Sequence, residues 1–420
     1  MKTFLKNILV WILGGQIRRL CRRHHFKIIG VVGSIGKTST KIAIAKILQS
    51  ERRVRYQEGN YNDTVSVPLV FFGHSIPSLW NIFAWALILL KNEYQILGDY
   101  PFDVVVLELG TDGPNQIGQF RRFLHLDIAV LTAVSPEHME FFKTLENVAD
   151  EEWSVSFFSD LIFANRDLCK MVPDNLDHKK IIFYGKDLGS SYKMENIERN
   201  VSGFNFDISR EGKKLISLSY GAISEVELYT ITASFVVASQ FGLKETSFKE
   251  AIKKISGFPG RMQKLKGIKK SIIIDDTYNA SPVAMKIALD TLYNFPGQPK
   301  VAILGMMNEL GESSAEEHAK VGSYCNPQKL KLVVTIGVDA NTYLAPRARE
   351  RGCEVYEAKD ASDAGQHVVN MLQEGGSVIL AKGSQNGVYA EEALKPLLAS
   401  SSDISRLVRQ DAVWMKKKQS

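Results

Sequence analysis

Short apolar segments alternate with longer helical patterns along much of the chain. Five apolar runs predict β-strands: FKIIGVVG (26–33), FDVVVLEL (102–109), LDIAVLTAV (126–134), DLIFAN (160–165) and KKIIFYG (179–185). Continuous apolar runs of this kind are typical of parallel strands that are buried on both faces of a sheet. Helical patterns follow several of them, such as KIAIAKILQ after the first run. This alternation predicts the α/β class.

The pattern weakens between residues 186 and 228, where FNFDISREGKKLISLSY predicts a short antiparallel hairpin. Helices are predicted around 230–241 and 247–255, before the turn-rich segment SGFPGRMQ. The alternation then resumes, with strands at SIIIDD, KVAILGMM, KLVVTIG and SVILAKGS. We therefore predict two α/β domains: a central domain over 26–255 with a mostly parallel sheet, and a Rossmann-like domain over 256–420.

The first 25 residues predict a separate basic amphipathic leader (1–25). The apolar stretch FLKNILVWILGG is followed by QIRRLCRRHH, which holds four arginines. The apolar part is shorter than the roughly 20 residues that span a bilayer, and no small-residue cleavage site follows it. Two interpretations stay open: a helix that lies in an anionic membrane surface, or a helix that packs on the protein body or on a partner. At the other end, VWMKKKQS predicts a solvated basic tail.

Composition places the chain among globular proteins. Of its 420 residues, 45% are hydrophobic and 23% are charged, which allows a large core. The four cysteines lie far apart, which argues against a zinc site or a disulfide scaffold and fits a reducing cytosol. The net charge of +6 suits anionic substrates, whereas nucleic-acid binders usually show denser basic patches. We expect a cytoplasmic protein without a nucleic-acid partner, at the inner face of the cell membrane if the leader binds lipid.

The stretch GVVGSIGKTST (30–40) joins a predicted strand to a predicted helix and has the composition of a phosphate-binding loop (P-loop). Glycines let the backbone curl so that its N–H groups point at phosphate oxygens, and the helix N-terminus adds positive charge. Lys37 would reach the terminal phosphates and Thr38 would offer its hydroxyl to Mg²⁺. Val31 replaces the first glycine of the common pattern, and a structural turn is the alternative. The predicted nucleotide contacts are Gly33, Ser34, Gly36, Lys37, Thr38 and Ser39.

Two further polar residues follow neighbouring strands. Glu108 ends the apolar run VVVLE, and His138 lies just beyond the next run. Carboxyl ends of parallel strands meet at one edge of a sheet, so both side chains are candidates to hold Mg²⁺ beside the loop. The alternatives are a solvent-facing glutamate and a packing or surface histidine. Together these features predict a phosphoryl-transfer domain that depends on Mg²⁺.

Several motifs resemble those of the Mur ligases, ATP-dependent enzymes that form amide bonds in peptidoglycan synthesis. GSIGKTST is similar to their phosphate loop, and GNYNDTVSVPL (59–69) is similar to the GNxNNxIGVPL segment of the MurF-type members. The MurF-type segments PGRM, DDSYNANP, LGDMxELG and KGS have counterparts in FPGRMQ, IIDDTYNASP (273–282), LGMMNELGESSAEEH (304–318) and AKGSQNGVYAEEAL (381–394). The resemblance covers about 28–414 and implies the family's two α/β domains.

The resemblance also implies residue roles. LELG and SPEHMEFFKTLENVA resemble the segments that carry the family's magnesium-binding glutamate and histidine, which fall on Glu108 and His138. Lys382 and Ser384 would hold the incoming dipeptide, although Gln385 stands where an arginine is common and Lys382 also fits a surface lysine at a strand end. The remaining implied contacts are Arg261, Asp276 and Asn279 with ATP, and Asn60, Asn62 and Thr64 with substrate.

Three departures from the family pattern stand out. The family's N-terminal domain, which holds the UDP part of the substrate, is expected to be missing, with the basic leader in its place. Glu152 falls on the position of the family's carbamylated lysine, so its carboxylate either replaces that group directly, or the second metal is bound differently or lost. A solvated acidic helix face at 150–152 is the alternative. Finally, GAISEVELYT (221–230) lacks the histidine and asparagine of the family's G-x-H-x-x-x-N stretch.

The activity implied is ligation with ATP and Mg²⁺. ATP would phosphorylate a substrate carboxylate to an acyl phosphate, which an amine then attacks with release of phosphate. The expected substrates are a UDP-muramoyl peptide and D-alanyl-D-alanine, and Lys37, Glu108, His138 and Glu152 are the residues expected to act in catalysis. Two alternatives remain: another amide ligase of the superfamily with a different acceptor, and a membrane-associated ATP-binding protein without ligase turnover.

Overall fold

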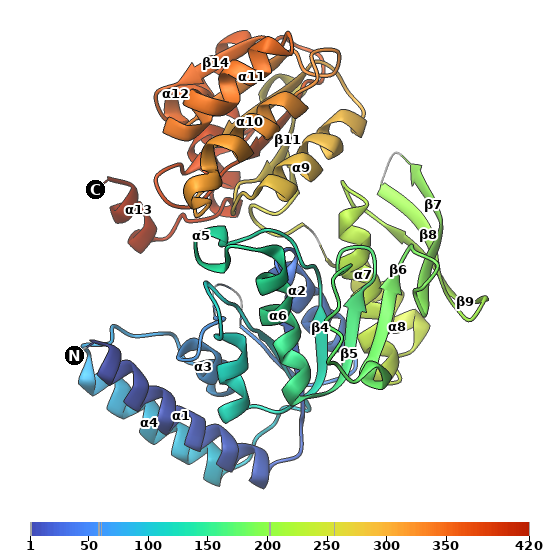
Figure 1. Cartoon of the computed structure of the whole chain (residues 1–420), viewed down its shortest axis with the longest axis vertical. Coiled ribbons are helices and arrows are strands. Elements are labelled where there is room, and N and C mark those ends of the chain that lie inside the picture. The colour runs from blue at the N-terminus through green and yellow to red at the C-terminus, as the bar shows by residue number, and fades with distance from the viewer. Residues whose placement is uncertain (1, 58, 60, 201–202, 256, 420) are drawn as a thin grey trace. The chain divides into compact units, whose positions relative to one another are not determined.

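The computed structural model of the chain describes residues 2–57, 59, 61–200, 203–255 and 257–419. The chain divides into two compact units. The first comprises Met1–Ser135, Phe141–Gly221 and Glu225–Ile255, and the second comprises Pro136–Glu140, Ala222–Ser224 and Ser256–Ser420. In Figure 1 the first unit runs from blue to green and the second lies mainly in yellow to red.

The first unit is built around one sheet, whose described strands follow the order β2-β3-β1-β4-β5-β6-β7-β8-β9. Pairing is parallel from β2 to β7 and antiparallel from β7 to β9. The predicted hairpin is therefore confirmed, and a third strand, β7, precedes it. The strands are β1 Lys27–Val32, β2 Val54–Arg55, β3 Val104–Glu108, β4 Leu126–Leu131, β5 Ser159–Asn165, β6 Ile181–Gly185, β7 Tyr192–Asn200, β8 Gly203–Arg210 and β9 Lys213–Tyr220.

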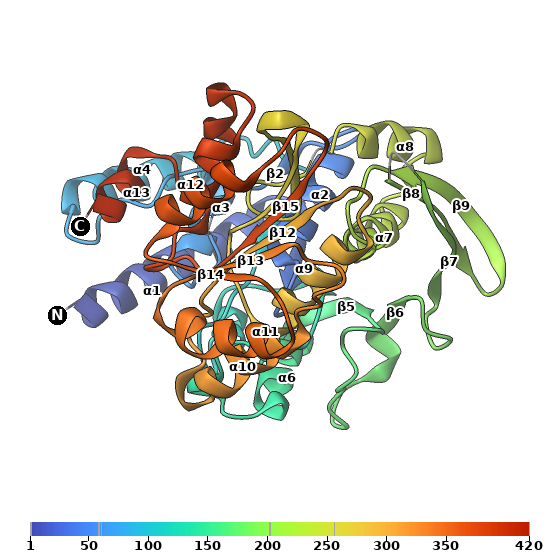
Figure 2. The ribbon, with the colours of Figure 1, turned by 90° about the horizontal axis from the view of Figure 1, so that it is seen from above.

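Helices cover both faces of this sheet. Figures 1 and 2 show α6 on one face and α2, α7 and α8 together on the other. Apolar strands buried on both faces are the consequence, and every residue of β3 is buried. The helices are α1 Lys2–Arg23, α2 Lys37–Leu48, α3 Ser66–Phe72, α4 Ile82–Leu97, α6 Leu145–Trp153, α7 Val226–Gln240 and α8 Glu245–Lys253, with the short 3₁₀ helices η1 Ile117–Arg122, η2 Ser154–Phe158 and η3 His178–Lys180.

The basic leader forms α1, which packs on the body of the first unit. Leu9 and Leu13 of α1 share an apolar cluster with Trp85 and Ile88 of α4. This contact matches the packing interpretation of the leader, and it leaves the opposite face of α1 outward. Within the described residues, no helix combines the length and the apolar character needed to cross a bilayer.

The second unit holds a smaller sheet of described strands in the order β10-β11-β15-β12-β13-β14. Pairing is parallel except between β10 and β11. The strands are β10 Gln263–Lys266, β11 Ile272–Asp276, β12 Lys300–Gly305, β13 Leu332–Ile336, β14 Val355–Ala358 and β15 Val378–Lys382. The helices are α9 Pro282–Asn294, α10 Ser314–Tyr324, α11 Ala345–Glu350, α12 Ala361–Met371 and α13 Ala412–Gln419, with η4 Ile268–Lys270, η5 Gly311–Ser313, η6 Ala340–Leu344, η7 Ala390–Leu397 and η8 Ser401–Arg406. The short helix α5 Met139–Phe142 spans the point at which the chain passes from the second unit back into the first.

Alternate residues of these strands enter two separate cores, as the pleat of a sheet requires. Ile274 and Leu380 face the core formed with α9, α10 and α11, whereas Ile273 and Ile379 face the core formed with α12 and η7. The predicted fold class, a parallel-sheet central domain followed by a Rossmann-like α/β domain, is confirmed. The prediction of a solvated C-terminal tail is wrong for Lys418, because its buried ammonium lies 2.8 Å from the Glu391 carboxylate.

Candidate functional site

The P-loop follows β1 and leads into α2. Gly33 has φ 122° and Gly36 has φ 85°, both in the region that favours glycine. A Cβ on Gly33 would lie 2.4 Å from Thr132 Oγ1 and 2.8 Å from the Ala133 nitrogen, so glycine is required there on spatial grounds as well. Ser34 is anchored by its backbone N–H, which donates to the Ala133 carbonyl at 2.9 Å. The strand–loop–helix context predicted for a phosphate cradle is therefore present.

The side chains at the start of α2 contact the P-loop backbone and the end of β3. Lys37 donates from its ammonium to the Gly33 carbonyl across the loop. Thr38 is buried and its hydroxyl donates to Glu108 Oε1 at 3.1 Å. Glu108, the last residue of β3, is 3% exposed, so the solvent-facing interpretation of this glutamate is wrong.

A lysine that sequence reasoning missed shares this cluster. Lys41 Nζ lies 3.1 Å from Glu108 Oε2, and both side chains are buried. Lys41 also donates to the Gly59 carbonyl at 3.2 Å. The signal for it was present, because Lys41 follows Lys37 by one helical turn and both therefore lie on the same face of α2. The pair leaves one oxygen of Glu108 directed at the Thr38 hydroxyl.

Glu152 lies beneath the P-loop and is fully buried. Its Oε2 accepts the backbone N–H of Gly33 at 2.7 Å. The neighbouring Glu151 is buried too, and it accepts the backbone N–H groups of Gln116 and Ile117 at 2.7 and 2.6 Å, which caps η1. The interpretation of 150–152 as a solvated acidic helix face is therefore wrong for both glutamates, although Asp150 is exposed. A metal-binding role for Glu152 stays a prediction.

Of the predicted substrate residues in the first unit, Asn60 lies outside the described residues. Asn62 is half-buried and its carbonyl accepts the Gly110 N–H at 2.8 Å, just beyond β3. Its side chain lies against Gly110, where an added Cβ would approach Asn62 Nδ2 to 2.5 Å. Thr64 and Ser39 are both half-buried. The structure thus places Asn62 beside the strand that carries Glu108.

In the second unit, two neighbouring strands end in opposite charges. Asp276 ends β11, Lys382 ends β15, and the two residues are paired in register. Lys382 Nζ lies 2.5 Å from Asp276 Oδ2 and also donates to the Asn279 carbonyl at 2.9 Å. Lys382 is 3% exposed, so its interpretation as a surface lysine is wrong. The predicted ATP contacts Asp276 and Asn279 and the predicted dipeptide contact Lys382 thus belong to one cluster.

Ser384 continues that cluster. Its hydroxyl accepts the Asn308 N–H at 2.9 Å, and the Ser384 N–H donates to the Met306 carbonyl at 3.1 Å. These bonds connect the segment after β15 to the segment after β12. Arg261 lies at the start of the same unit, with its guanidinium 3.9 Å from the centre of the Tyr278 ring. Asn279, the residue after Tyr278, is exposed.

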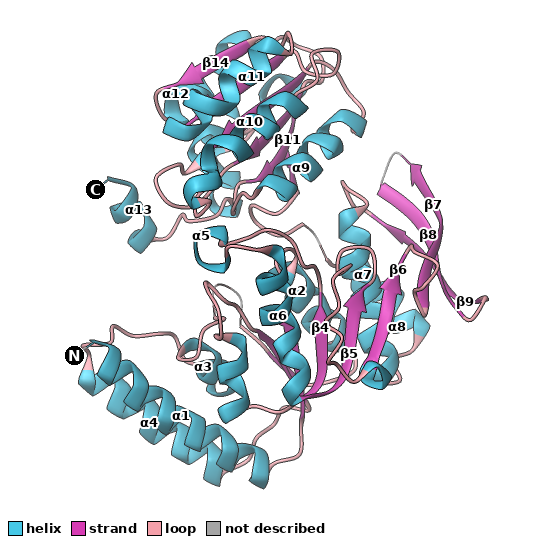
Figure 3. Cartoon of the chain, viewed as in Figure 1, coloured by secondary structure: helices cyan, strands magenta, loops and turns pink. Residues whose placement is uncertain are grey.

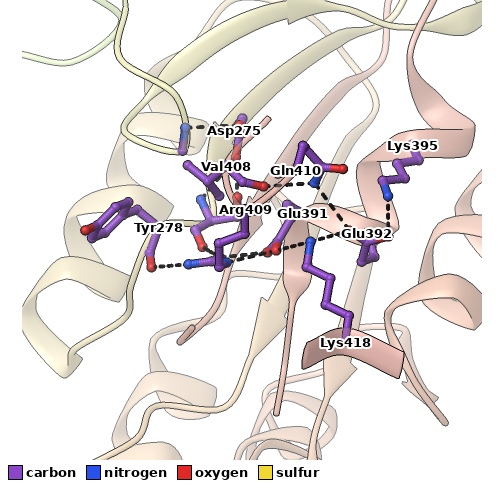
Figure 4. Close-up of polar contacts among 11 residues, drawn as sticks. Asp275, Tyr278, Glu391, Glu392, Lys395, Val408, Arg409, Gln410 and Lys418 are labelled. Atoms are coloured by element: carbon purple, nitrogen blue, oxygen red, sulfur yellow. Dashed lines mark hydrogen bonds and ion pairs between the residues drawn. The ribbon is translucent and has the colours of Figure 1, made fainter. Parts of the chain in front are cut away.

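A buried charge cluster holds the loop that carries Asn279, and sequence reasoning missed it. Arg409 donates to both oxygens of Glu391 at 2.9 and 2.7 Å and to the carbonyls of Thr277 and Tyr278 at 2.5 and 2.9 Å. Figure 4 shows Arg409 between the Glu391 carboxylate and the Tyr278 carbonyl, with Lys418 reaching Glu391 from the other side. No motif marks Arg409, because a long-range contact of this kind leaves no local pattern.

The loop is also fixed by a buried carboxyl group at its base. Asp275 accepts the N–H and the hydroxyl of Thr277 at 3.1 and 2.6 Å, and Oδ2 accepts the Gly260 N–H at 3.2 Å. Burial raises the pKa of Asp275 to about 6, and the hydrogen bonds from Thr277 oppose that rise. The start of the loop between β11 and α9 is therefore held by both Asp275 and Arg409.

His138 belongs with the second unit, although it follows a strand of the first. Its Nδ1 lies 2.7 Å from Glu309 Oε2, and the hydrogen bond from His138 holds the pKa of Glu309 below its ordinary value. Both residues have positive φ, 48° for His138 and 64° for Glu309. Glu309 lies in the NELG motif and was not singled out from the sequence. The meeting of His138 and Glu108 at one metal ion stays a prediction.

Each unit matches a known protein domain. Residues 90–238 match the Mur ligase middle domain, and residues 260–385 match the Mur ligase, glutamate ligase domain. The chain belongs to the Mur ligase family. The two matches fall on the two units that carry the P-loop cluster and the Asp276–Lys382 cluster.

Among its relatives are two proteins named UDP-N-acetylmuramoyl-tripeptide–D-alanyl-D-alanine ligase. The one from Haemophilus influenzae is 26% identical over 341 residues, which is 77% of this chain and 67% of the relative. The one from Bacillus subtilis is 26% identical over 388 residues, 89% of this chain and 76% of the relative. The MurF ligase of Thermotoga maritima, solved in complex with ADP, superposes with a TM-score of 0.73 at 24% identity, covering 92% of this chain and 83% of that one. That superposition establishes the Mur ligase fold.

The P-loop residues of this Mur ligase fit a triphosphate and Mg²⁺. Magnesium takes oxygen ligands and usually keeps several waters, so one hydroxyl and one carboxylate from the protein suffice. Thr38 and Glu108 supply that pair within 3.1 Å of each other. Among the described residues, no three histidine, cysteine, aspartate or glutamate side chains gather as a denser metal site.

Proposed function

We propose that the chain is an ATP- and Mg²⁺-dependent, ADP-forming amide ligase of the MurF type. It joins D-alanyl-D-alanine to the terminal carboxylate of a UDP-muramoyl tripeptide. The observation that carries the proposal is the P-loop cluster, in which Lys37, Thr38 and Glu108 lie at one edge of a parallel sheet. The names of the relatives supply the substrates.

The protein's part in this reaction is to bind, orient and neutralise. Gly33 and Gly36 shape the loop that receives the phosphates, and Lys37 moves from the Gly33 carbonyl to the terminal phosphate as the nucleotide enters. Thr38 and Glu108 would hold Mg²⁺, which would neutralise charge on the transferred phosphoryl group. Glu152 holds the loop backbone through the Gly33 N–H.

The second unit supplies the remaining contacts under this proposal. Arg261, Asp276 and Asn279 contact the nucleotide, whereas Lys382 and Ser384 contact the dipeptide. Lys382 and Asp276 form an ion pair within the protein. Under this proposal, Lys382 exchanges that partner for the dipeptide and Asp276 for the nucleotide. Asn62 and Thr64 contact the muramoyl peptide, and His138 would be a further ligand of the metal.

The proposed location is the cytoplasm, at the inner face of the cell membrane, which residues 1–25 contact peripherally. The outward face of α1 supports this contact, because Trp11 is 74% exposed there and Arg18 and Arg22 are exposed as well. The buried thiols of Cys169, Cys325 and Cys353 are free, as expected in a reducing compartment.

The proposal is tested by measuring phosphate release from ATP with Mg²⁺. We expect release only when the UDP-muramoyl tripeptide and D-alanyl-D-alanine are both present, and a loss of about 10²–10³-fold in Lys37→Met because its charge on the terminal phosphate disappears. Lys46→Met, on the last turn of the same helix, is the matched control and should keep its rate.

Two results would contradict the proposal. Release that ignores both organic substrates indicates an ATPase without ligation. Release that needs ATP and an amine other than the dipeptide indicates an amide ligase with a different acceptor.

A further inference from the structure

The outward faces of α1 and α4 carry a set of large apolar side chains. None of these residues belongs to the proposed nucleotide and substrate contacts. Phe83 is 90% exposed and Tyr94 is 81% exposed. We call this set the α1–α4 surface; it consists of Ile8, Trp11, Phe83, Leu87, Leu90, Tyr94 and Leu97.

The apolar face of α4 runs along the whole helix. Positions 83, 87, 90, 94 and 97 are spaced by three or four residues and therefore form one stripe. The opposite face buries Trp85, Ile88 and Ile96 together with Asn92. A contiguous exposed apolar patch on a protein marks a site of protein or membrane contact, so the outward stripe of α4 indicates a partner surface.

Helix α1 lies beside α4 and extends this surface. Gln16 donates to the Leu89 carbonyl at 2.9 Å, Arg19 pairs with Glu93, and Arg23 donates to the Leu97 carbonyl at 3.0 Å. Both residue numbers rise together along these contacts, so the helices run parallel, side by side as Figure 3 shows. The two helices thus present one fixed platform.

The charge on this platform is positive. Arg18 and Arg22 follow Trp11 by seven and eleven residues and therefore share its outward face of α1. Arg18 also donates to the Arg122 carbonyl at 2.8 Å. Arg122, which is itself exposed, therefore lies close to Arg18 of α1. The acidic side chain of α4, Glu93, is already paired with Arg19. The platform therefore combines an apolar stripe with unbalanced arginines.

We propose that the α1–α4 surface binds the face of a phospholipid bilayer that carries anionic lipids. The stripe of α4 and Trp11 enter the boundary between headgroups and acyl chains, and the arginines contact the negative headgroups. Trp11 and Tyr94 have the amphipathic rings that favour this boundary. The inference rests on the membrane-side location proposed above and names α4 as the main contact; it is independent of the ligase chemistry.

Co-sedimentation of the full chain with vesicles tests the proposal. We expect strong binding to vesicles of phosphatidylcholine mixed with phosphatidylglycerol and weak binding to phosphatidylcholine alone. The double variant F83S/L90S should bind vesicles at least about tenfold more weakly, because it removes two apolar side chains that would be buried in the bilayer. Arg22→Gln should bind vesicles about fivefold more weakly, and added salt should also weaken vesicle binding.

Matched controls separate this surface from general stickiness. Leu188→Ser changes another highly exposed leucine of the first unit, and Arg351→Gln changes an exposed arginine elsewhere; both should bind vesicles as the unchanged chain does. Circular dichroism and thermal melting check that F83S/L90S folds. Brominated lipid should quench tryptophan fluorescence more in the unchanged chain than in Trp11→Phe, a readout that needs no variant of α4.

Several outcomes would overturn the proposal. These are equal binding to both vesicle types, no binding to either, and equal losses in Leu188→Ser and F83S/L90S. Self-association that F83S/L90S abolishes, without vesicle binding, would assign the surface to a second copy instead. Phosphate release measured in solution on the same variants should be unchanged, so a failure of membrane binding is distinguishable from a failure of the proposed ligase activity.

Discussion

Glu152 is the residue whose environment differs most from what its sequence position implies. An acidic stretch on a short helix is ordinarily solvated, yet Glu152 is fully buried and accepts the Gly33 N–H at 2.7 Å. This bond fixes the backbone of the loop that receives the phosphates. Lys41 is likewise a buried charged residue, and it is paired with Glu108. Buried charges around the P-loop therefore come in partnered sets, as the cost of desolvation requires.

Two substitutions of Glu152 separate positioning from metal binding. Glu152→Gln keeps an acceptor for the Gly33 N–H, whereas Glu152→Ala leaves that buried donor without one. We expect Ala to lower the free energy of unfolding by about 1–3 kcal/mol and to raise the KM for ATP, with Gln close to the unchanged chain in both. Urea unfolding and ATP titration measure these effects, and Asp150→Ala, on the exposed side of α6, is the control.

The opposite pattern would refute a purely positioning role. If Glu152→Gln folds normally and binds ATP normally but needs far more Mg²⁺ for turnover, the negative charge itself is required. That result would support the metal-binding prediction made from the resemblance to the carbamylated lysine.

At the scale of elements, the loop between β11 and α9 is held by residues from the far end of the chain. Arg409 joins the Glu391 carboxylate to the carbonyls of Thr277 and Tyr278, and Lys418 of α13 completes the cluster. The C-terminal segment therefore acts as a brace for the loop that carries Asn279, one of the proposed ATP contacts, and that directly follows Asp276.

Breaking this brace should be costly. Arg409→Met removes one partner of a buried ion pair and leaves two loop carbonyls without their donor, so we expect a loss of about 3 kcal/mol in the free energy of unfolding of the second unit. Arg406→Met breaks an exposed pair with Asp403 and should cost less than about 1 kcal/mol. Urea unfolding followed by fluorescence compares the two. Equal losses would show that the cluster is not a specific brace.

Elements with a continuous apolar pattern could be predicted from the sequence, and elements with mixed patterns could not. The parallel strands β1, β3, β4, β5 and β6 were predicted because their residues are buried on both faces. Strand β7, YKMENIERN, was missed because its exposed residues are polar or charged and its partner, β8, supplies most of its pairing. The apolar character of α4 gave no warning of its exposure, since the same residues would suit a buried helix.

The candidate site divides in the same way. Gly33, Lys37, Thr38 and Glu108 form a local motif plus one strand end, and the sequence locates both. The contacts of Lys382 with Asp276, of His138 with Glu309 and of Arg409 with Glu391 join segments far apart in sequence. Tertiary packing decides such pairs, so the sequence identified some of their members, His138 from its position after a strand and Asp276 and Lys382 from family motifs, but not their partnerships.

At the scale of the whole molecule, the two proposals rest on different sets of residues. The P-loop cluster and the Asp276–Lys382 cluster carry the proposed ligase chemistry, and the α1–α4 surface carries the proposed contact with lipid. Binding of this chain to a bilayer would hold the proposed ligase reaction at the membrane surface. The two properties are separable by the variants described above.

The transfer of oxygen from the substrate carboxylate to phosphate tests the central claim most directly. In the proposed reaction a carboxylate oxygen attacks the terminal phosphorus of ATP, and that oxygen leaves with phosphate when the amine of D-alanyl-D-alanine attacks the carbonyl carbon. With a UDP-muramoyl tripeptide labelled with ¹⁸O in its reacting carboxylate, mass spectrometry should find one labelled oxygen in each phosphate released. Unlabelled phosphate would show that water, and not the carboxylate, receives the phosphoryl group, and would contradict the account.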